Sequence, residues 1–178
     1  MAVQPAVLTL EEFHKLYDGQ KPAYEYWYGQ ALRKPMPTVL HGIVQAILVM
    51  LLESAGWNTA SEVRLKVVRE VEPVPDLIAV RGKFKGRYPA AAPELCVEIM
   101  SPADTLAKTL DKSKQYIAWG SEHVWIIDPE KRTAWDLSAE APGLSWIPPE
   151  GSLRIAETAI DLSAIFAGVD KKLEFIAE

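Results

Sequence analysis

Two acidic residues of the chain lie among apolar neighbours. Glu98 stands inside the apolar run from 95 to 100, and Asp76 stands between Pro75 and the apolar run from 77 to 80. A buried carboxylate is costly unless it is paired, hydrogen-bonded or bound to a cation. If the two runs form neighbouring strands, the two carboxylates can reach one hard divalent cation, which prefers oxygen ligands. The alternatives are a Glu98 that is partly wet or neutralised by a core arginine, and an Asp76 that caps a turn.

A lysine and a further acid can complete such a site. Lys112 lies in the expected helix from 104 to 119, which follows the Glu98 strand and should pack back over the sheet. Its ammonium could orient a metal-bound water or stabilise the charge of a phosphate; the alternative is a solvated lysine. Tyr116 lies one turn away on the same face and could support the site by a hydrogen bond. Glu25, on an aromatic strand, is a fourth candidate acid, and its alternative is an exposed strand position.

Apolar periodicity and capping signals predict the elements that position these residues. Thr9 and Glu12 form a capping-box pattern that predicts a short helix to about residue 18. The runs 77–80 and 95–100 are almost continuously apolar, which is typical of strands in a sheet covered on both faces. Further helices are expected over residues 38–56, 104–119 and 161–166, and further strands over 24–28, 31–34, 63–67, 123–127, 133–137 and 153–155.

Length and composition favour one globular domain. The chain has 178 residues, of which 49% are hydrophobic and 24% are charged, and these values exclude disordered, collagen-like and coiled-coil proteins. We expect a single domain over residues 1–178, with a looser acidic segment from about residue 138. No apolar stretch approaches the ~20 residues of a membrane span, and the N-terminus lacks a secretory pattern. A cytoplasmic location without a membrane partner is therefore expected, and Cys96 should be an inert thiol in the core.

The net charge of −5 is unevenly distributed. Residues 1–132 contain 16 basic and 16 acidic side chains, whereas residues 133–178 contain 3 basic and 8 acidic ones. This balance argues mildly against a protein that binds nucleic acid without specificity. The segment 81–87 differs, because it has four cations and two glycines in seven residues and is expected to be a loop that contacts a nucleic-acid backbone. Its cations are Arg81, Lys83, Lys85 and Arg87.

A series of short motifs follows the order of a known family. The motifs are Tyr24-Glu25 with Gly29, His41 early in a long helix, Pro75-Asp76, the segment Val97–Pro102, Lys112 with Tyr116, and the segment Val124–Pro129. In this order they resemble the Uma-two-type family of restriction-endonuclease-like proteins, over about residues 9–166. The Glu-x-x-Ser-Pro and Trp-x-x-Asp-Pro segments are the most specific of these motifs.

The resemblance implies a PD-(D/E)XK nuclease-like fold, which is an α/β (α+β) fold with a mixed central sheet flanked by helices. It also implies a divalent-metal phosphodiesterase centre in which Asp76 and Glu98 are metal ligands. The usual lysine two residues after the glutamate is Met100 in this chain, and the resemblance transfers its role to Lys112. The acid that commonly follows the glycine of the first strand is Gln30 here.

The histidines are less informative than the acids. His41 could contact a phosphate or support the edge of the core, and we favour the structural or supporting role. His14 and His123 have no acidic or histidine neighbour at metal-ligand spacing, which disfavours a histidine-rich zinc site. The chain also lacks Gly-x-Ser-x-Gly, Walker and Gly-x-Gly-x-x-Gly patterns, which disfavours serine hydrolases, nucleotide hydrolases and dinucleotide-binding proteins.

The leading hypothesis is a Mg²⁺- or Mn²⁺-dependent endonuclease that hydrolyses phosphodiester bonds of DNA. Asp76 and Glu98 would hold the ion, Lys112 would position or activate water, and Glu25 would assist. A homodimer is expected to bury the hairpin around 124–127, together with Trp135, because this hairpin is too apolar for an exposed edge.

Two alternatives from other classes remain open. A binding or assembly protein could retain the fold without turnover, and the acidic C-terminal quarter favours it because nucleic-acid affinity comes mainly from phosphate neutralisation. A two-carboxylate hydrolase could act on another substrate such as a glycoside, although the sequence shows nothing specific for saccharides.

Overall fold

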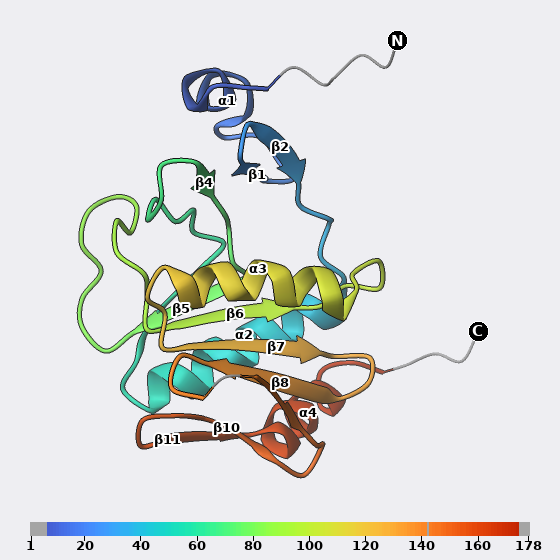
Figure 1. The fold of residues 1–178 in the computed structure, drawn as a ribbon. Coiled ribbons are helices and arrows are strands. Elements are labelled where there is room, and N and C mark those ends of the chain that lie inside the picture. Colours follow the sequence, from blue (N-terminus) through green and yellow to red (C-terminus); the bar gives the residue numbers. More distant parts are fainter. Residues whose placement is uncertain (1–6, 142, 175–178) are drawn as a thin grey trace.

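The computed structural model describes residues 7–141 and 143–174, and its main element is a six-stranded mixed sheet with the strand order β3-β5-β6-β7-β8-β9 (Figure 1). These strands are β3 (Asn58–Ser61), β5 (Leu77–Val80), β6 (Leu95–Ile99), β7 (His123–Asp128), β8 (Thr133–Ser138) and β9 (Leu144–Ile147). The β6 and β7 strands run parallel, and the other neighbouring pairs are antiparallel. A parallel pair needs a crossover connection, which α3 (Leu106–Ala118) provides.

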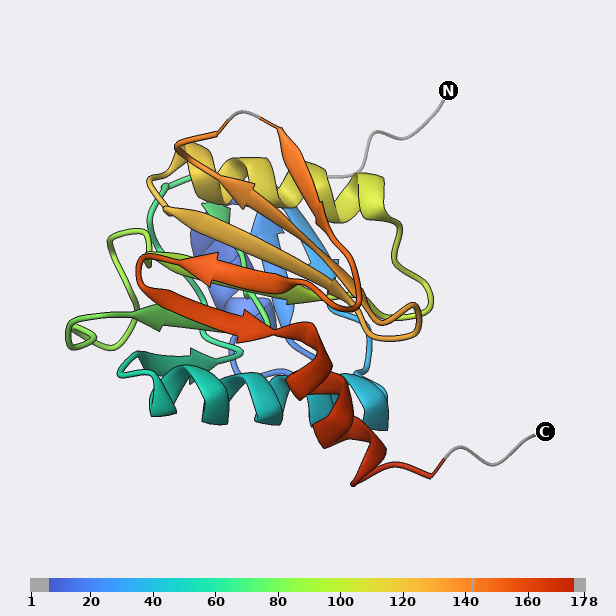
Figure 2. The ribbon, with the colours of Figure 1, turned by 90° about the horizontal axis from the view of Figure 1, so that it is seen from below.

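Helices cover both faces of this sheet. The helices α2 (Val39–Ser54) and α4 (Leu162–Asp170) lie on one face, and α3 lies on the other (Figure 2). The hairpin of β10 (Ser152–Ile155) and β11 (Thr158–Asp161) packs on the α2 side. Because side chains alternate along a strand, β6 directs Val97 into the core under α2 and Cys96 into the core under α3. Glu98 has the same parity as Cys96 and therefore lies on the α3 side.

The N-terminal part forms a second, smaller layer that we call the cap. It consists of α1 (Leu10–Tyr17) and a three-stranded sheet of order β2-β1-β4, with β1 (Tyr24–Trp27), β2 (Gln30–Arg33) and β4 (Val71–Glu72). The cap lies above the main sheet in Figure 1 and contacts α3, because Glu25 of β1 lies 2.7 Å from the Nζ of Lys112 on α3. It therefore faces the side of β6 that carries Glu98.

Most of the predicted elements are confirmed. The capping box forms, because the Thr9 amide donates to Glu12 Oε2 at 2.8 Å and the Glu12 amide donates to Thr9 Oγ1 at 3.2 Å. The hairpin around Gly29, the three longer helices and the central strands lie where the periodicity places them. The basic segment 81–87 is an irregular loop, and Cys96 is fully buried.

The predicted strand over residues 63–67 is wrong. The strand in this region is β3, which ends before Glu62 because Glu62 adopts a left-handed φ of 56°. The alternation of Val63, Leu65 and Val67 reflects burial, since all three pack into the core under α3. Their backbone is irregular, with the Leu65 amide donating to the Pro73 carbonyl at 2.9 Å. Every second side chain of this segment therefore packs into the core although the segment is not a strand.

The surface expected to form a homodimer is not exposed. Residues 124–127 belong to β7, which lies between β6 and β8, and their side chains are fully buried. Trp135, on β8, stands opposite Trp146 of β9, so β8 is not an edge either. The apolar content of this hairpin is explained by its central place in the sheet.

The acidic C-terminal segment contributes to the core. Strands β9 and β11 were not predicted, whereas β10 and α4 match the expected strand and helix. Leu153, Ile160 and Phe166 pack into the core under α2. None of the helices in the described ranges is both long and apolar enough to cross a bilayer.

The turn between β1 and β2 depends on the backbone conformation of Gly29. Tyr28 and Gly29 both have positive φ, 48° and 85°, as a two-residue hairpin of this twist requires. Gly29→Ala should lower the free energy of unfolding by about 1 kcal/mol or more, because a non-glycine residue is strained there and its Cβ would collide with Val7. Gly42→Ala, in an open position within α2, should be neutral or stabilising. Urea denaturation compares the two variants, and equal stabilities would contradict this account of the turn.

Candidate functional site

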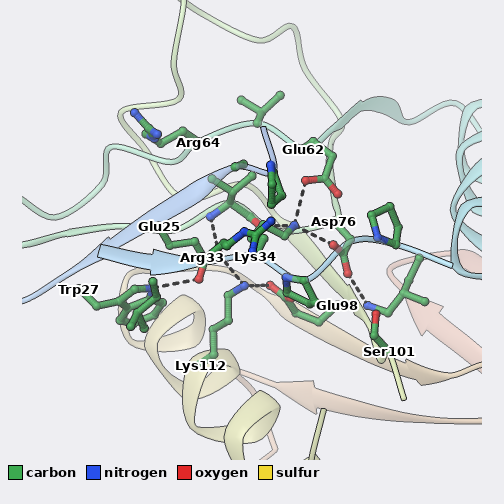
Figure 3. Close-up of a pocket in the computed structure, with 18 of the residues that line it drawn as sticks. Glu25, Trp27, Arg33, Lys34, Glu62, Arg64, Asp76, Glu98, Ser101 and Lys112 are labelled. Atoms are coloured by element: carbon green, nitrogen blue, oxygen red, sulfur yellow. Dashed lines mark hydrogen bonds and ion pairs between the residues drawn. The ribbon is translucent and has the colours of Figure 1, made fainter. Parts of the chain in front are cut away.

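A pocket of about 1220 Å³ lies between the cap and the main sheet. It collects side chains from β1, β2, α2, α3 and the ends of β5 and β6 (Figure 3). Six of the candidate site residues from the sequence line it, namely Glu25, His41, Asp76, Arg87, Glu98 and Lys112. These residues are up to 87 positions apart in the chain and are brought together by the fold.

The strand register brings Asp76 and Glu98 to the same face. Leu77 of β5 stands opposite Val97 of β6, so the next position places Asp76 opposite Glu98. Both side chains are almost completely buried, at 4% and 7% exposure. Asp76 is also fixed by its neighbour strand, because the Ile99 amide donates to Asp76 Oδ2 at 2.7 Å.

Lys112 joins the acid on β6 to the acid in the cap. Its Nζ lies 2.7 Å from Glu25 Oε1 and 2.9 Å from Glu98 Oε1. Tyr116, one turn along α3 and fully buried, donates its hydroxyl to Glu98 Oε1 at 2.7 Å. Glu25 also accepts from the Val74 amide at 2.8 Å. The helix therefore aims one ammonium and one phenol at the carboxylates, as the spacing of Lys112 and Tyr116 indicated.

Sequence reasoning missed a second lysine at the site. Lys34, which directly follows β2, places its Nζ 2.8 Å from Asp76 Oδ1, 2.9 Å from Glu62 Oε2 and 2.8 Å from the Val74 carbonyl oxygen. Both Lys34 and Glu62 looked like ordinary polar ends of strands, so the sequence carried no signal for them. Gln45 was visible in the sequence, because it interrupts the apolar face of α2. Its side-chain amide donates to the Asp76 carbonyl oxygen at 2.5 Å.

His41 faces the Asp76 carboxylate from the first turn of α2. Its Nε2 lies 3.6 Å from Asp76 Oδ1, and the side chain is 5% exposed. Neither ring nitrogen has a hydrogen-bond partner within residues 7–141 and 143–174. The Thr38 hydroxyl accepts from the His41 amide at 3.1 Å, which fixes the helix start. His41 is thus a polar group in the site rather than a satisfied residue at the edge of the core.

Burial and the mixed charges set the protonation states. Burial raises the pKa of Glu98 to about 7, against the opposing effect of Lys112. Burial would lower the pKa of Lys112, but the carboxylates of Glu25 and Glu98 raise it above its ordinary value. For Asp76 the opposing effects of burial and of the Lys34 charge leave the pKa lowered. Near neutral pH, Asp76 is ionised, Lys112 is protonated and Glu98 is close to its midpoint.

The donor set suits a hard divalent cation. Such ions take carboxylate and carbonyl oxygens, and the pocket offers both types. Single ligand atoms from His41, Glu62 and Asp76 all lie within 4.8 Å of one another. The residues present therefore fit a divalent metal, and Asp76 is common to this group and to the pair expected from the sequence.

The basic loop divides between the pocket and the outer surface. Arg87 lines the pocket, whereas Arg81 contacts Glu122 at 3.2 Å. Lys83 and Lys85 are exposed and do not belong to the pocket lining. Three exposed cations that the sequence did not single out also line the pocket, namely Lys21, Arg33 and Lys108.

The other two histidines acquire acidic partners through the fold. His14 Nε2 lies 2.8 Å from Glu72 Oε2, and His123 Nδ1 lies 2.9 Å from Asp136 Oδ1. Spacing along the chain did not reveal these pairs. Neither pair belongs to the group of three possible metal ligands around His41.

Replacing Glu98 by glutamine should make stability less dependent on pH. In wild type the folded-state pKa is about 7, against an ordinary value of 4.5. Between these values the folded protein keeps a proton that the unfolded chain has released, so this group lowers the free energy of unfolding as pH rises. Urea denaturation at pH 5, 6 and 7 in chelator should show a smaller decline for Glu98→Gln. An unchanged decline, equal to that of the surface control Glu157→Gln, would contradict the shifted pKa.

Comparisons with known proteins agree with the fold and the motifs. The family model described as "Uma2: Putative restriction endonuclease" matches residues 10–160. A crystal structure described as a "putative nuclease belonging to DUF820" from Anabaena variabilis ATCC 29413 is similar, with a TM-score of 0.77, 22% identity, and coverage of 91% of this chain and 99% of that chain. A cryo-EM structure of a DrdV–DNA complex has a TM-score of 0.39 and 21% identity over 57% of this chain and 9% of that chain. A comparison with curated proteins gave no match.

The likeness to the Anabaena structure confirms the expected fold, a mixed sheet with flanking helices. The family match spans the chain from the start of α1 to β11, and it includes every residue of the acid and lysine cluster. The chain therefore belongs to the Uma2 family, described as "putative restriction endonuclease".

Proposed function

We propose that the chain is an endonuclease that hydrolyses phosphodiester bonds of DNA with Mg²⁺ or Mn²⁺ as its cofactor. One observation carries the proposal: Asp76 and Glu98 are buried on neighbouring strands, and an ammonium from α3 reaches the same pocket. Family membership supports the reaction class. The pocket opens between two layers and carries exposed cations, as a site for a polyanion requires.

In this proposal Asp76 and Glu98 hold the cation. A bound divalent ion would supply Lewis acidity and lower the pKa of a water, as in other metal-dependent hydrolases. Asp76 is prepared for this role because it is ionised and because the Ile99 amide fixes one of its oxygens. Glu98 is oriented by the Tyr116 hydroxyl, which leaves its carboxylate facing the pocket.

Lys112 acts as a fixed positive charge. Since its pKa is raised, it remains protonated and can stabilise the charge that develops on a phosphate, but it cannot accept a proton. The sequence suggested that Lys112 could position or activate a water, and we now propose only roles in which the ammonium keeps its proton. Glu25 holds the ammonium in place from the cap and is itself held by the Val74 amide. Tyr116 supports the same arrangement from behind Glu98.

The DNA backbone would pass over the pocket along exposed cations. Arg33, Arg87 and Lys108 line the pocket from β2, the basic loop and α3. Arg81, Lys83 and Lys85 would extend this contact beyond it. Phosphate contacts of this kind supply most of the affinity without reading sequence.

A homodimer remains part of the proposal, because two chains provide one site for each strand of a duplex. Its interface cannot be β7, which is buried. The edge strand β9 carries Trp146 at 59% exposure, and we propose this edge as the interface instead.

Lys112→Gln should reduce the cleavage rate of plasmid DNA in Mg²⁺ or Mn²⁺ by ~10² or more, the scale of losing one charge-stabilising group. Glutamine is preferable to alanine because it can still donate hydrogen bonds to the two buried carboxylates. Circular dichroism checks the fold. Lys114→Gln, at an exposed lysine that contacts Asp111, is the matched control and should retain activity.

Equal rates in the two variants would refute the role of Lys112. If wild type cleaves neither single-stranded nor duplex DNA nor RNA with either metal, the endonuclease proposal fails and the alternative of a binding or assembly protein takes its place.

The cations that line the pocket should determine the salt dependence of DNA binding. Replacing Arg33, Arg87 and Lys108 by glutamine should reduce the slope of log K against log salt by about 0.9 for each DNA phosphate that the variant no longer neutralises. Binding is measured by fluorescence anisotropy without metal, so that cleavage does not interfere. A second variant that removes Arg81, Lys83 and Lys85 measures the outer part of the loop, and Arg154→Gln is the surface control. An unchanged slope in both triple variants would remove DNA from the proposed substrates of this surface.

A further inference from the structure

We infer that Glu62, His41 and the carbonyl oxygen of Val74 complete the cation position that Asp76 and Glu98 begin, and that the ammonium of Lys34 holds this position in the metal-free chain. The inference rests on the proposed function, since it concerns the same metal centre. It goes beyond the pair Asp76 and Glu98 by assigning further ligands and an internal competitor.

The contacts of Lys34 mark the position. Its Nζ is surrounded by two carboxylate oxygens and one main-chain carbonyl oxygen at 2.8 to 2.9 Å, from Asp76, Glu62 and Val74. Carboxylate and carbonyl oxygens are the ligands that hard divalent cations take. The Lys34 side chain is 13% exposed, so the ammonium is fixed inside the pocket rather than solvated. Lys34 thus occupies a ready set of oxygen ligands.

Strand register explains why Glu62 belongs to this set. Ser61 of β3 stands opposite Leu77 of β5, and the Glu62 amide donates to the Asp76 carbonyl oxygen at 3.2 Å. Glu62 directly follows β3, Asp76 directly precedes β5, and Glu98 lies on β6, so the three carboxylates form one row across neighbouring strands. In this row Glu98 Oε1 already contacts Lys112 and Tyr116, whereas Glu62 and Asp76 share Lys34.

His41 is independent evidence for a ligand at this position. It is 4% exposed and reaches to 3.6 Å from Asp76 Oδ1, yet both ring nitrogens lack partners within the described ranges. A buried polar group without a hydrogen bond is costly. A metal ion beside Asp76 would satisfy the free imidazole nitrogen, which an ammonium has not done here. Since imidazole is a better ligand for transition metals than for Mg²⁺, the set favours Mn²⁺.

Lys34 is then a displaceable counter-ion. It neutralises Asp76 and Glu62 while no metal is bound, because a buried carboxylate without a partner is strongly unfavourable. A divalent cation that takes the same oxygens must move the ammonium aside. Removing the ammonium should therefore tighten metal binding, whereas removing a ligand should weaken it.

Calorimetric titration of Mn²⁺ into wild type and four variants tests the inference. Glu62→Gln and His41→Phe should each raise the Kd for Mn²⁺ by ~10-fold or more. Lys34→Met should lower it by ~10-fold or more, and His41→Phe should affect Mg²⁺ less than Mn²⁺. Glu157→Gln, which removes an exposed acid in the β10–β11 turn, is the matched control and should match wild type.

Thermal unfolding provides a second readout for Lys34→Met, which leaves two carboxylates without their cation. This variant should be less stable than wild type in chelator and should gain more stability from Mn²⁺. If it does not fold in chelator, the Glu62→Gln and His41→Phe titrations still decide the question, since Glu62 has a side chain 43% exposed and its replacement leaves the core intact.

Two further variants separate this inference from the proposed function. Asp76→Asn should abolish binding in either account, and unchanged binding in that variant would refute the metal centre as a whole. If Asp76→Asn and Glu98→Gln weaken Mn²⁺ binding while the Glu62, His41 and Lys34 variants keep the wild-type Kd, the inference is overturned and the proposed metal pair stands.

Discussion

The structure depends on the mutual neutralisation of buried charges between the cap and the main sheet. Lys112, from α3, bridges Glu25 of the cap and Glu98 of the sheet, and Lys34, from the cap, reaches Asp76 beside the sheet. Lys112 thus reaches from the main layer towards the cap, and Lys34 reaches from the cap towards the main sheet. Removing one partner of a buried ion pair costs about 3–5 kcal/mol, because it leaves an uncompensated charge. The charges therefore specify where the cap sits, even if their net contribution to stability is small.

The remaining elements keep these charges in place. The antiparallel register of β3, β5 and β6 aligns Glu62, Asp76 and Glu98, and the parallel step to β7 forces the chain through α3. That crossover puts Lys112 over the acids. On the other face, α2 packs against the same strands and brings the buried His41 to the site from its first turn. One sheet thus connects the apolar core to the polar pocket.

The sequence predicted the parts of this arrangement that leave a local signal. Glu98 and Asp76 were visible because charged residues rarely interrupt apolar strands, and Lys112 and Tyr116 because their spacing places them on one helix face. The fold was predicted from periodicity together with the order of the family motifs. The central place of β7 was missed, since an apolar run looks the same in a buried strand and in an exposed interface.

The rest could not be predicted because it depends on contacts between distant segments. Lys34 and Asp76 are 42 residues apart, and the strand that ends just before Glu62 was placed several residues too late in the sequence. The two lysines also differ in what they do for the acids. Lys112 is held by two carboxylates and a helix, whereas Lys34 fills a position that suits a metal. Because Lys34 can be displaced by a cation while Lys112 stays in place, we infer that the pocket acts as a metal centre.

The most direct test of this claim is anomalous diffraction from crystals of the protein soaked in Mn²⁺. The account predicts an anomalous peak in contact with the Asp76 carboxylate, with the Lys34 ammonium moved away from it and Lys112 still contacting Glu25 and Glu98. A structure without a peak in this pocket, in which Lys34 keeps its contacts with Asp76 and Glu62 at saturating Mn²⁺, would contradict it.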